Sequence, residues 1–502
     1  MEPSRLGLLC IACFFARKTA RMTNGEIIES YVPARLDRMP WSSWHWLIVV
    51  SLGATWILDG LEVTLAGAVG GILTRRETLG LTDTQVGTSA TCYLGGAVLG
   101  ALLFGYGTDR FGRKKLFFIT VAVYLIGTAL SAFSWNFWSY AVFRAITGAG
   151  IGGEYAAINS AIDELIPARV RGRVDLIING SYWIGAAIGA AATLVLLDAR
   201  YIPIWLGWRC AFAIGATLGL IVIFFRRWIP ESPRWLMIHG RNVEAEEILA
   251  EVERKILGAN AAGITDPGYK EMPTRIRTRT HTPWREIWKA IVHEHRRRSF
   301  LGFVLMSTQA FFYNAIFFTY ALVLMRFYSV PEQNVGGYLL PFALGNVLGP
   351  LLLGHLFDTI GRKQMITLTY GLAGILLALT GWLFHAGVLT AQTQTFAWTI
   401  IFFVASAAAS SAYLTVSEIF PLEIRAMAIA VFYAVGTLAG GVGAPILFGW
   451  IIGTGSITAL FLGYLVAAAL MIFGAAIEAW IGVPAERRSL EHVAAPLSSK
   501  GL

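Results

Sequence analysis

Two acidic residues, Asp59 and Glu62, lie near the middle of an apolar run that extends from about Trp46 to Leu73. A run of this length can cross a bilayer, which needs ~20 apolar residues in a helix. A carboxylate at the centre of a bilayer costs roughly 2.5–3.5 kcal/mol on insertion scales. Because the two acids are three residues apart, they share nearly one helix face. The pair therefore indicates a buried cavity, a buried partner or a transported charge.

A second pair of charges, Arg144 and Glu154, falls inside another apolar run. The two residues are close to three helical turns apart, so they face similar directions. Arg144 could neutralise Glu154 or Asp59, or bind a substrate carboxylate through its planar guanidinium; a structural ion pair is the other interpretation. Like charges as close as Asp59 and Glu62 cannot both ionise cheaply. One of these acids is therefore expected to exchange a proton, as proton coupling requires.

The composition indicates a membrane protein. The chain has 502 residues, of which 56% are hydrophobic and 14% charged, whereas soluble proteins carry ~25% charged residues. Apart from Arg144, which is inside a span, only five basic residues fall on one side of the predicted spans. They are Arg75, Arg76, Arg200, Arg209 and Arg326. Because basic residues concentrate in cytoplasmic loops, both termini and the long central loop are expected in the cytoplasm. The net charge of +9 then needs no nucleic-acid partner.

The hydropathy predicts an all-α membrane protein, because backbone groups in lipid must be hydrogen-bonded within a helix. Twelve spans are expected at about 46–73, 84–107, 115–133, 137–162, 174–197, 208–228, 299–327, 333–357, 364–385, 393–417, 427–453 and 456–482. Glycines at 148, 150, 152 and 153, and at 436, 440, 441 and 443, fit close helix–helix approach.

The spans divide the chain into five parts. They are a cytoplasmic N-terminal segment (1–45), a six-helix half (46–228), a cytoplasmic central loop (229–298), a second six-helix half (299–482) and a cytoplasmic tail (483–502). Within the central loop, Val243 to Leu257 has apolar residues at helical spacing. An amphipathic helix is expected there, either as a connector or as a regulatory or lipid-binding element.

Two short blocks recur in the same order. Gly105–Lys114 returns as Gly354–Lys363, and Glu164–Pro167 with Arg171 returns as Glu418–Pro421 with Arg425. The offsets are 249 and 254 residues, so the two six-helix parts are duplicated halves. Parallel halves around a central cavity are a transporter architecture, with the substrate near the bilayer midplane.

The repeated blocks lie at cytoplasmic helix ends and predict a gate. Asp109 can accept backbone N–H groups at a helix N-terminus and pair with Arg113. Such contacts exist only while helix ends are close, so they would hold one of two conformations; topology-setting charge around a tight glycine turn is the alternative. The expected gate residues are Asp109, Arg110, Arg113, Glu164, Arg171, Asp358, Arg362, Glu418 and Arg425.

These motifs resemble the major facilitator superfamily. Its G-x-x-x-D-R-x-G-R-K loop stands at 105–114, with a copy at 354–363 that has Thr359 in place of Arg. Arg144 with Gly148, Gly150 and Gly152, and the segments Pro230–Leu236 and Pro484–Glu491, resemble its sugar-porter and metabolite:proton-symporter branch. The resemblance covers about 46–492 and implies twelve helices, inner-membrane placement and secondary active transport.

The resemblance to sugar porters is incomplete. Their seventh helix usually carries Gln-Gln followed by Gly-x-Asn, whereas Ser307–Asn314 has one Gln and no such Gly. Asp59-Gly60-Leu61-Glu62 resembles instead the D-G-x-D of aromatic-acid:proton symporters, with Glu62 replacing the second Asp.

Polar and aromatic residues within the spans are candidates for a cavity lining, because such a mixture suits a small organic ligand. On the seventh span Gln309, Phe312, Tyr313, Ile316 and Tyr320 recur at three- and four-residue steps, and Asn314 lies beside them. Candidates on other spans are Asn159, Asn179, Tyr182, Trp183, Asn346, Tyr413 and Tyr433.

The sequence thus predicts a proton-coupled symporter of a small organic carboxylate, such as an aromatic acid. Asp59 or Glu154 would carry the proton, and Arg144 would meet the anion or reset the carboxylate. Alternatives are a sugar or polyol porter, an exporter of amphipathic drugs, and a substrate sensor. An enzyme is not expected, since no nucleophile–base pair, metal-ligand cluster or ATP-binding loop stands out. The energy source would be a proton gradient without a cofactor, and the transporter is expected to function as a monomer.

Overall fold

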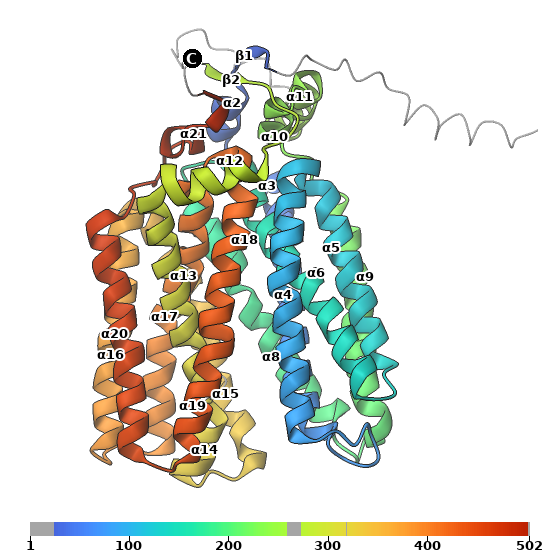
Figure 1. Ribbon diagram of the computed structural model, residues 1–502, viewed down its shortest axis with the longest axis vertical. Helices are drawn as coiled ribbons and strands as arrows, with labels where there is room; N and C mark the ends of the chain where they lie inside the picture. Colours follow the sequence, from blue (N-terminus) through green and yellow to red (C-terminus); the bar gives the residue numbers. More distant parts are fainter. Residues whose placement is uncertain (1–24, 259–272, 318, 500–502) are drawn as a thin grey trace, which may run out of the picture.

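A computed structural model describes residues 25–258, 273–317 and 319–499 of the chain. Long helices form two groups that stand side by side (Figure 1). The first group contains α3 (Ser43–Ile72), α4 (Asp83–Phe111), α5 (Arg113–Ala132), α6 (Phe137–Leu165), α7 (Arg171–Gly180), α8 (Tyr182–Leu196) and α9 (Ile204–Arg226). The second contains α13 (Arg296–Phe317), α14 (Tyr320–Tyr328), α15 (Glu332–Thr359), α16 (Arg362–His385), α17 (Ala391–Ile419), α18 (Arg425–Gly436), α19 (Ala444–Gly453) and α20 (Ile457–Ile481).

Eleven helical segments within the described residues are long and apolar enough to cross a membrane. The remaining predicted span corresponds to α6, which has 29 residues but interrupts its apolar surface with buried charges. Those charges are Arg144, Glu154, Asp163 and Glu164. The twelve-helix, two-half fold is therefore confirmed, and the span that hydropathy does not mark is the one that carries these four buried charges.

Three predicted spans are interrupted rather than continuous. The fifth breaks at Ser181, whose hydroxyl donates to the carbonyls of Gly53 (3.1 Å) and Ile178 (2.6 Å). The seventh divides into α13 and α14, and the eleventh contains a π-helical turn at Thr437–Gly443. Hydropathy reports the length of an apolar run and not its backbone pairing, so these breaks could not be predicted from it.

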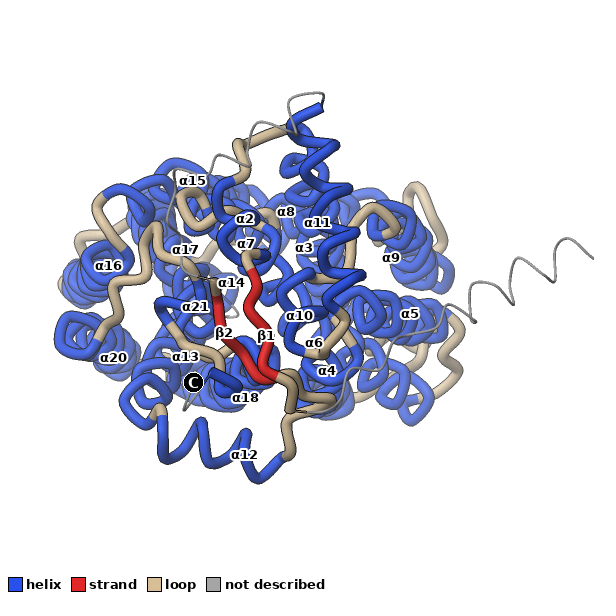
Figure 2. Tube along the Cα trace, turned by 90° about the horizontal axis from the view of Figure 1, so that it is seen from above, coloured by secondary structure: helices blue, strands red, loops and turns tan. Residues whose placement is uncertain are grey.

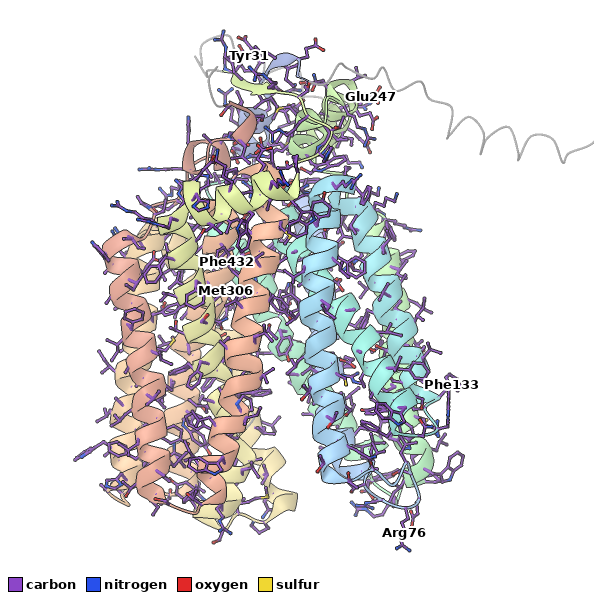
Figure 3. All side chains as sticks on the ribbon, viewed as in Figure 1. Tyr31, Arg76, Phe133, Glu247, Met306 and Phe432 are labelled. Carbon is purple, nitrogen blue, oxygen red and sulfur yellow. The ribbon has the colours of Figure 1, made fainter. Side chains whose placement is uncertain are left out.

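Short elements gather at one end of the helices, which we call the capped face (Figures 1 and 2). They are β1 (Ile27–Ser30), α2 (Val32–Arg38), α10 (Pro233–Ile238), α11 (Asn242–Leu257), β2 (Thr274–Arg277), α12 (Trp284–Lys289) with a following π-helical turn (Ala290–Glu294), and α21 (Leu490–Val493). Figure 3 places Tyr31 and Glu247 at this end and Arg76 and Phe133 at the opposite end. The capped face is the one whose loops are predicted to be cytoplasmic.

The capped face joins segments that are distant in sequence. Strands β1 and β2 pair in antiparallel register, with Ile28 opposite Ile276, and so connect the N-terminal segment to the central loop. This small sheet is an addition to the predicted all-α architecture. The predicted amphipathic helix is present as α11, which buries Ala245, Leu249 and Val252.

Glycines allow the helices of the first group to approach closely. A Cβ atom on Gly148 would lie 2.0 Å from the carbonyl oxygen of Tyr93, and one on Gly152 would lie 1.9 Å from that of Ala97. In the second group, a Cβ on Gly440 would lie 2.2 Å from the carbonyl carbon of Ala310. The predicted packing role is confirmed at these positions, whereas a Cβ on Gly443 would meet only one atom, at 3.9 Å.

We expect Gly148→Ala to lower the melting temperature in detergent, because the added methyl group must push α4 and α6 apart. Overpacking of this kind costs about 1–3 kcal/mol. Gly67→Ala is the matched control, since a Cβ there meets nothing within 4 Å. Equal melting temperatures for the two variants would contradict the tight α4–α6 contact.

Candidate functional site

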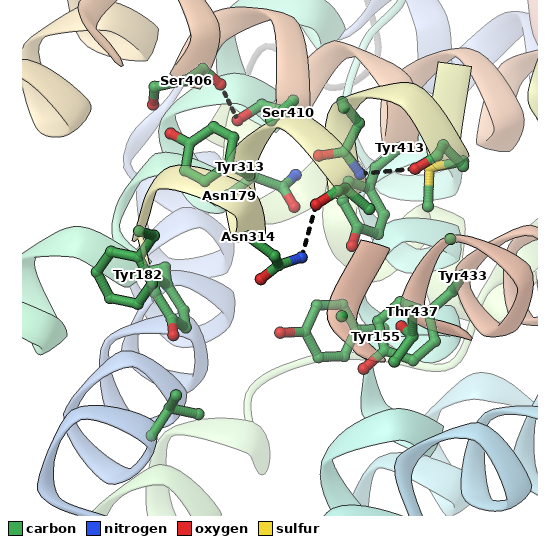
Figure 4. A pocket seen from close by; sticks show the side chains of 18 of the residues that line it. Tyr155, Asn179, Tyr182, Tyr313, Asn314, Ser406, Ser410, Tyr413, Tyr433 and Thr437 are labelled. Carbon is green, nitrogen blue, oxygen red and sulfur yellow. Dashed lines mark hydrogen bonds between the residues drawn. The ribbon is translucent and has the colours of Figure 1, made fainter. Parts of the chain in front are cut away.

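A cavity of about 240 Å³ lies between the two groups, and Figure 4 shows it from close by. Its aromatic lining residues are Trp56, Tyr93, Tyr155, Tyr182, Trp183, Tyr313, Phe317, Tyr413 and Tyr433, and its polar ones are Asn179, Gln309, Asn314, Ser406, Ser410 and Thr437. None of its described lining residues is acidic or basic. The cavity is therefore an uncharged, aromatic site with amide and hydroxyl groups, which suits a small organic ligand.

One stripe of α13 faces the cavity. It runs through Met306, Gln309, Ala310, Tyr313 and Phe317, and Asn314 lies beside it. Gln309, Tyr313 and Asn314 were predicted at this position, and they line the cavity.

Phe312, Ile316 and Tyr320 do not line the cavity, contrary to the prediction. Phe312 and Ile316 are completely buried in the second group. The hydroxyl of Tyr320 lies 2.9 Å from that of Thr395 and donates to the carbonyl of Tyr338. Steps of three and four residues follow both faces of a helix equally well, so the spacing alone could not separate the two stripes.

Two predicted lining residues support the wall from behind. Asn346 accepts a hydrogen bond from the hydroxyl of Tyr313 and donates to the carbonyl of Phe342 (2.9 Å). Asn159 donates to the carbonyl of Tyr155 (2.8 Å) and accepts from Asn179 (3.3 Å). Both amides are completely buried. They orient the lining rather than form it.

The other lining residues come from several helices. Tyr182 and Tyr413 were predicted to line the cavity and do so. Ser406 and Ser410 were missed, although with Tyr413 they recur at four- and three-residue steps on α17, a signal that could have found them. Trp56 lies one turn before Asp59, while Tyr93 carries no sequence signal.

The four charged residues predicted to bind substrate or protons lie behind the cavity wall, in the interior of the first group. Arg144 pairs with Glu62 and not with Glu154 or Asp59, and its guanidinium lies 4.6 Å from the ring centroid of Tyr93. Tyr93 lines the cavity. Tyr93 thus contacts both the cavity and the guanidinium of Arg144.

Glu154 has a partner that the sequence did not reveal, Arg226. Arg226 also donates to the carbonyl of Phe117 and to the hydroxyl of Thr55, each at 2.8 Å. Asp59 is 2% exposed, its Oδ1 has no hydrogen-bond partner, and it lies within electrostatic reach of Glu62 and Arg226. Arg226 is at the end of a span, where charged residues are common, so its position in the sequence did not identify it as a partner of Glu154.

An aromatic cluster joins the two halves beside the cavity. Tyr155 stacks on Tyr433 with a centroid separation of 4.6 Å, and the ring of Trp56 meets that of Tyr155 edge-on at 4.5 Å. Tyr413 lies 6.0 Å from Tyr155. Trp56 and Tyr155 belong to the first group, whereas Tyr413 and Tyr433 belong to the second. The wall therefore includes contacts that must change if the halves move apart.

At the capped face, Asp109 connects the halves. Its carboxylate accepts hydrogen bonds from the backbone N–H groups of Ala426 (3.2 Å) and Met427 (2.9 Å), at the start of α18. Arg113 binds Asp109 (3.4 Å) and Glu164 (2.8 Å). The predicted contact with a helix N-terminus is confirmed, and it crosses from one half to the other.

The second half repeats this arrangement. Asp358 accepts from the backbone N–H groups of Gly172 (3.0 Å) and Arg173 (2.8 Å), at the start of α7. Arg362 binds Asp358 (2.8 Å) and Glu418 (3.0 Å). Two arginines add further contacts between the halves: Arg425 lies 3.6 Å from Glu164, and Arg171 lies 3.4 Å from Glu418. We call Asp109, Arg113, Glu164, Arg171, Asp358, Arg362, Glu418 and Arg425 the gate network.

Arg110 is not part of the gate network, although it was predicted to be. It is exposed, and its guanidinium lies 5.2 Å from the ring centroid of Phe111. Arg113, three residues later in the chain, is buried instead, with 1% of its surface exposed. The same position in the repeat is Thr359, which is also exposed, so the repeat does not preserve a charge there.

Two segments outside the spans reinforce the network. Glu231, in the Pro230–Leu236 segment, accepts from the backbone N–H of Arg113 (2.9 Å), and Glu486, in the Pro484–Glu491 segment, accepts from that of Arg362 (3.2 Å). Each therefore caps the helix that begins with a gate arginine. Burial raises the pKa of Glu231, opposed by its hydrogen bonds from backbone N–H groups and by Arg113.

Arg234 ties three segments together at the capped face. Its guanidinium binds Glu491 in the C-terminal tail (2.8 Å) and Asp37 in the N-terminal segment (2.9 Å). Asp37 in turn binds Arg171 of the gate network (3.2 Å). The structure is therefore the conformation in which the halves are joined at the capped face.

Comparisons with known proteins agree with this geometry. The family model described as sugar (and other) transporter matches residues 60–495. The chain is 27% identical over 417 residues to the niacin transporter NiaP of Acinetobacter baylyi, an alignment that covers 82% of this chain and 89% of that protein. It is 26% identical over 367 residues to the 4-hydroxybenzoate transporter PcaK of the same organism, covering 69% and 73%.

A solved structure shows the same fold. The proton:xylose symporter XylE bound to 6-bromo-6-deoxy-D-glucose superposes with a TM-score of 0.73 at 20% identity, covering 90% of this chain and 98% of that chain. An inward-open conformation of XylE from E. coli gives a TM-score of 0.58 at 19% identity. The matched family and these relatives are transporters rather than enzymes.

We expect Asp109→Asn to loosen the capped face in both halves of the network. Hydrogen bonds to a charged group contribute about 1.5–3 kcal/mol, so the joined state should lose roughly 10- to 100-fold in population. Hydrogen exchange measured by mass spectrometry should then quicken at Ala426–Met427 and also at Gly172–Arg173. Arg110→Ala is the matched control and should exchange like the unaltered protein. Faster exchange at the first site alone would contradict a coupled network.

Proposed function

This chain belongs to the sugar (and other) transporter family, and from that premise we propose that it is a proton-coupled symporter of a small aromatic acid. The resemblance to the major facilitator superfamily is confirmed by the family match and the fold. The protein is accordingly a multi-pass membrane transporter of the sugar and metabolite type. Substrate, coupling and direction are the parts that we propose.

One observation supports proton coupling: the described charged residues behind the cavity wall are three carboxylates but only two arginines. Glu62 pairs with Arg144, and Glu154 pairs with Arg226, but Asp59 has no arginine of its own. An unpaired carboxylate buried in a protein costs several kcal/mol. We infer that Asp59 carries a proton in this conformation and that it would lose this proton only when its surroundings change. That is the behaviour of a coupling site.

The location of Asp59 supports a link to the substrate. Gly60, the next residue, has no side chain and lies against α8, where a Cβ would come within 1.9 Å of the carbonyl oxygen of Tyr182. Tyr182 lines the cavity, as does Trp56, one turn before Asp59. We infer that the protonation of Asp59 and the shape of the cavity change together.

The gate network supports alternating access. It holds the halves together at the capped face, while the ribbons of the two groups diverge toward the opposite end (Figure 1). We propose that the capped face is cytoplasmic and that this conformation is closed to the cytoplasm. Because residues of both helix groups line the cavity together, we propose a monomer as the transporting unit.

The lining of the cavity supports an aromatic acid as substrate. Flat rings pack favourably on tyrosine and tryptophan faces, and Asn179, Gln309 and Asn314 supply hydrogen-bond donors and acceptors. Arg144 is engaged with Glu62 behind the wall, so in this conformation the amides rather than Arg144 would hold a carboxylate. The co-transported proton would offset its charge. The relatives that transport niacin and 4-hydroxybenzoate support this substrate class.

We expect Asp59→Asn to abolish accumulation driven by a pH gradient, because the variant holds one charge state at every pH. Uptake into proteoliposomes should fall to the level seen without a gradient, while exchange of labelled for unlabelled substrate continues. Glu478→Gln is the matched control: Glu478 is also a completely buried carboxylate without a hydrogen-bond partner on either oxygen, but it lies on α20 and outside the cavity lining. Full gradient-driven accumulation by Asp59→Asn would exclude Asp59 as the proton carrier.

We expect 4-hydroxybenzoate and nicotinate to compete for the site at least tenfold better than xylose or myo-inositol. Asn314→Ala should weaken binding of the preferred acid about three- to tenfold, the usual effect of losing one hydrogen bond. Asn334→Ala, at an exposed asparagine near the start of α15, should leave binding unchanged. Stronger competition by xylose or myo-inositol would favour a sugar or polyol porter instead.

A further inference from the structure

The charges of the gate network balance. Its acidic members are Asp109, Glu164, Asp358 and Glu418, and its basic members are Arg113, Arg171, Arg362 and Arg425. Each half contributes two of either sign, and none of the eight is more than 7% exposed. A buried network of this kind is stable only if every charge has partners. The four acids and the four arginines of the gate network are therefore equal in number, and Asp37 adds a further carboxylate at Arg171.

Two further acids, Asp163 and Asp175, disturb this balance. Both are completely buried, and none of their four carboxylate oxygens has a hydrogen-bond partner. They lie beside the network, on α6 and α7. If both were ionised, two unpaired negative charges would be buried where the halves meet, at a cost of several kcal/mol each.

The duplicated sequence confirms that these acids are additional to the network. At the offset of 254 residues that relates Arg171 to Arg425, Asp163 corresponds to Ser417 and Asp175 to Ile429. The second half thus completes the same contacts without either acid. Asp163 and Asp175 are not needed to build the gate.

Every arginine that faces the two acids is shared with another carboxylate, although Nε and Nη1 of Arg425 have no hydrogen-bond partner. Asp163 faces Arg171, Glu418, Arg425 and Ser417, and Asp175 faces Asp163, Glu418, Arg362 and Asn179. The three arginines already bind Glu164 or Glu418. Arg234, which is also buried, is bound by Asp37 and Glu491.

Asn179 extends from this site to the cavity. It lines the cavity, its Nδ2 donates to the backbone carbonyl of Asp175 (2.9 Å) and to Asn159 (3.3 Å), and its Oδ1 has no partner although the residue is only 7% exposed. A protonated carboxyl group has one O–H donor. Asn179 Oδ1 is an acceptor without a partner, so a protonated acid beside it could donate a hydrogen bond to it. Asn179 also places a polar amide between the cavity and the gate network.

We propose that Asp163 and Asp175 form a second proton-binding site, which is filled when the halves join at the capped face and empties when they separate there. The ligand is the proton itself, taken from water and bound to a carboxylate oxygen of each residue. Separation of the halves would admit water and let both carboxylates ionise. The site goes beyond the role of Asp59 and rests only on the alternating-access part of the proposed function.

This site would make the joining of the halves depend on pH even without substrate. The joined state binds more protons than the separated state, so raising the pH favours separation. Each proton released changes the ratio of the two states by up to about tenfold per pH unit, and two protons change it by up to about 100-fold. Acidic conditions stabilise the conformation described above.

The test is a distance measurement across the capped face. Arg110→Cys and Thr359→Cys place labels at equivalent, exposed positions at the ends of α4 and α15, in a background lacking the native Cys10, Cys13, Cys92 and Cys210. With spin labels, the purified protein in lipid nanodiscs is examined by double electron–electron resonance between pH 5 and 9, without substrate. The populations of short and long distances report the joined and separated states.

We expect Asp163→Asn with Asp175→Asn to separate much less steeply as the pH rises, because asparagine resembles the neutral acid in shape and charge and Asp59 alone would still release a proton. Each single change should make the ratio of joined to separated populations respond less steeply to pH, by a factor of up to about ten per pH unit. Asp163→Ser, which installs the residue of the other half, offers an alternative if the asparagine variant is poorly folded. A double variant with the same pH dependence as the starting protein would overturn the proposal.

Asp59→Asn separates this proposal from the proposed function. It should abolish gradient-driven accumulation and remove only the part of the pH dependence of the distance that Asp59 contributes, leaving the part that Asp163 and Asp175 contribute. If the double variant leaves that pH dependence intact while Asp59→Asn stops accumulation, the second site is wrong and the symporter stands. If the distance responds to the double variant while Asp59→Asn still accumulates substrate, the second site stands and Asp59 is not the carrier.

Discussion

Two carboxylates at helix termini decide how the halves of this transporter meet. Asp109 binds the N-terminus of α18 and Asp358 binds that of α7, so each half holds a helix of the other. A carboxylate there satisfies backbone N–H groups that have no partner within the helix and interacts with the positive end of its dipole. The contacts cross the same boundary, so both must break for the halves to part. The capped face therefore has the character of a two-state element, on which the accessibility of the cavity depends.

The fold and the gate network could be predicted because the sequence encodes them locally. Apolar runs of sufficient length report membrane helices directly, and the repeated loops place Asp109 and Asp358 at equivalent helix ends. What local patterns do not contain is the partner from the other half, or a short strand pair such as β1 with β2, whose strands come from segments far apart in the sequence. Arg110 illustrates the limit: it belongs to the motif, but it points away from the network.

The cavity was harder to predict because membrane helices bury apolar and polar residues on several faces. On α13, the stripe through Gln309 and Tyr313 faces the cavity, whereas Phe312 lies in the core of the second group. Both stripes contain aromatic residues at helical spacing, so only the neighbouring helices decide between them. The same holds for Arg144: its depth was evident from the sequence, but the choice of Glu62 over Glu154 depends on how α3, α6 and α9 pack together.

The separation of charge from the cavity has a mechanistic consequence. A substrate in the cavity would meet tyrosines, amides and hydroxyls. The charged side chains in the described part of the chain do not line the cavity: Arg144 lies against Tyr93, and Asp175 contacts Asn179. In the proposed symport, coupling between substrate and proton would then pass through the wall, by the movement of aromatic side chains at the contact between the halves, such as Tyr155 against Tyr433. A carboxylate without an ion-pair partner behind such a wall, as we propose for Asp59, would stay neutral while the wall is closed, because the dry interior disfavours its charge. In the proposed cycle, the wall that would hold the ring of an aromatic substrate would also control when water reaches Asp59, and a single rearrangement would serve both steps.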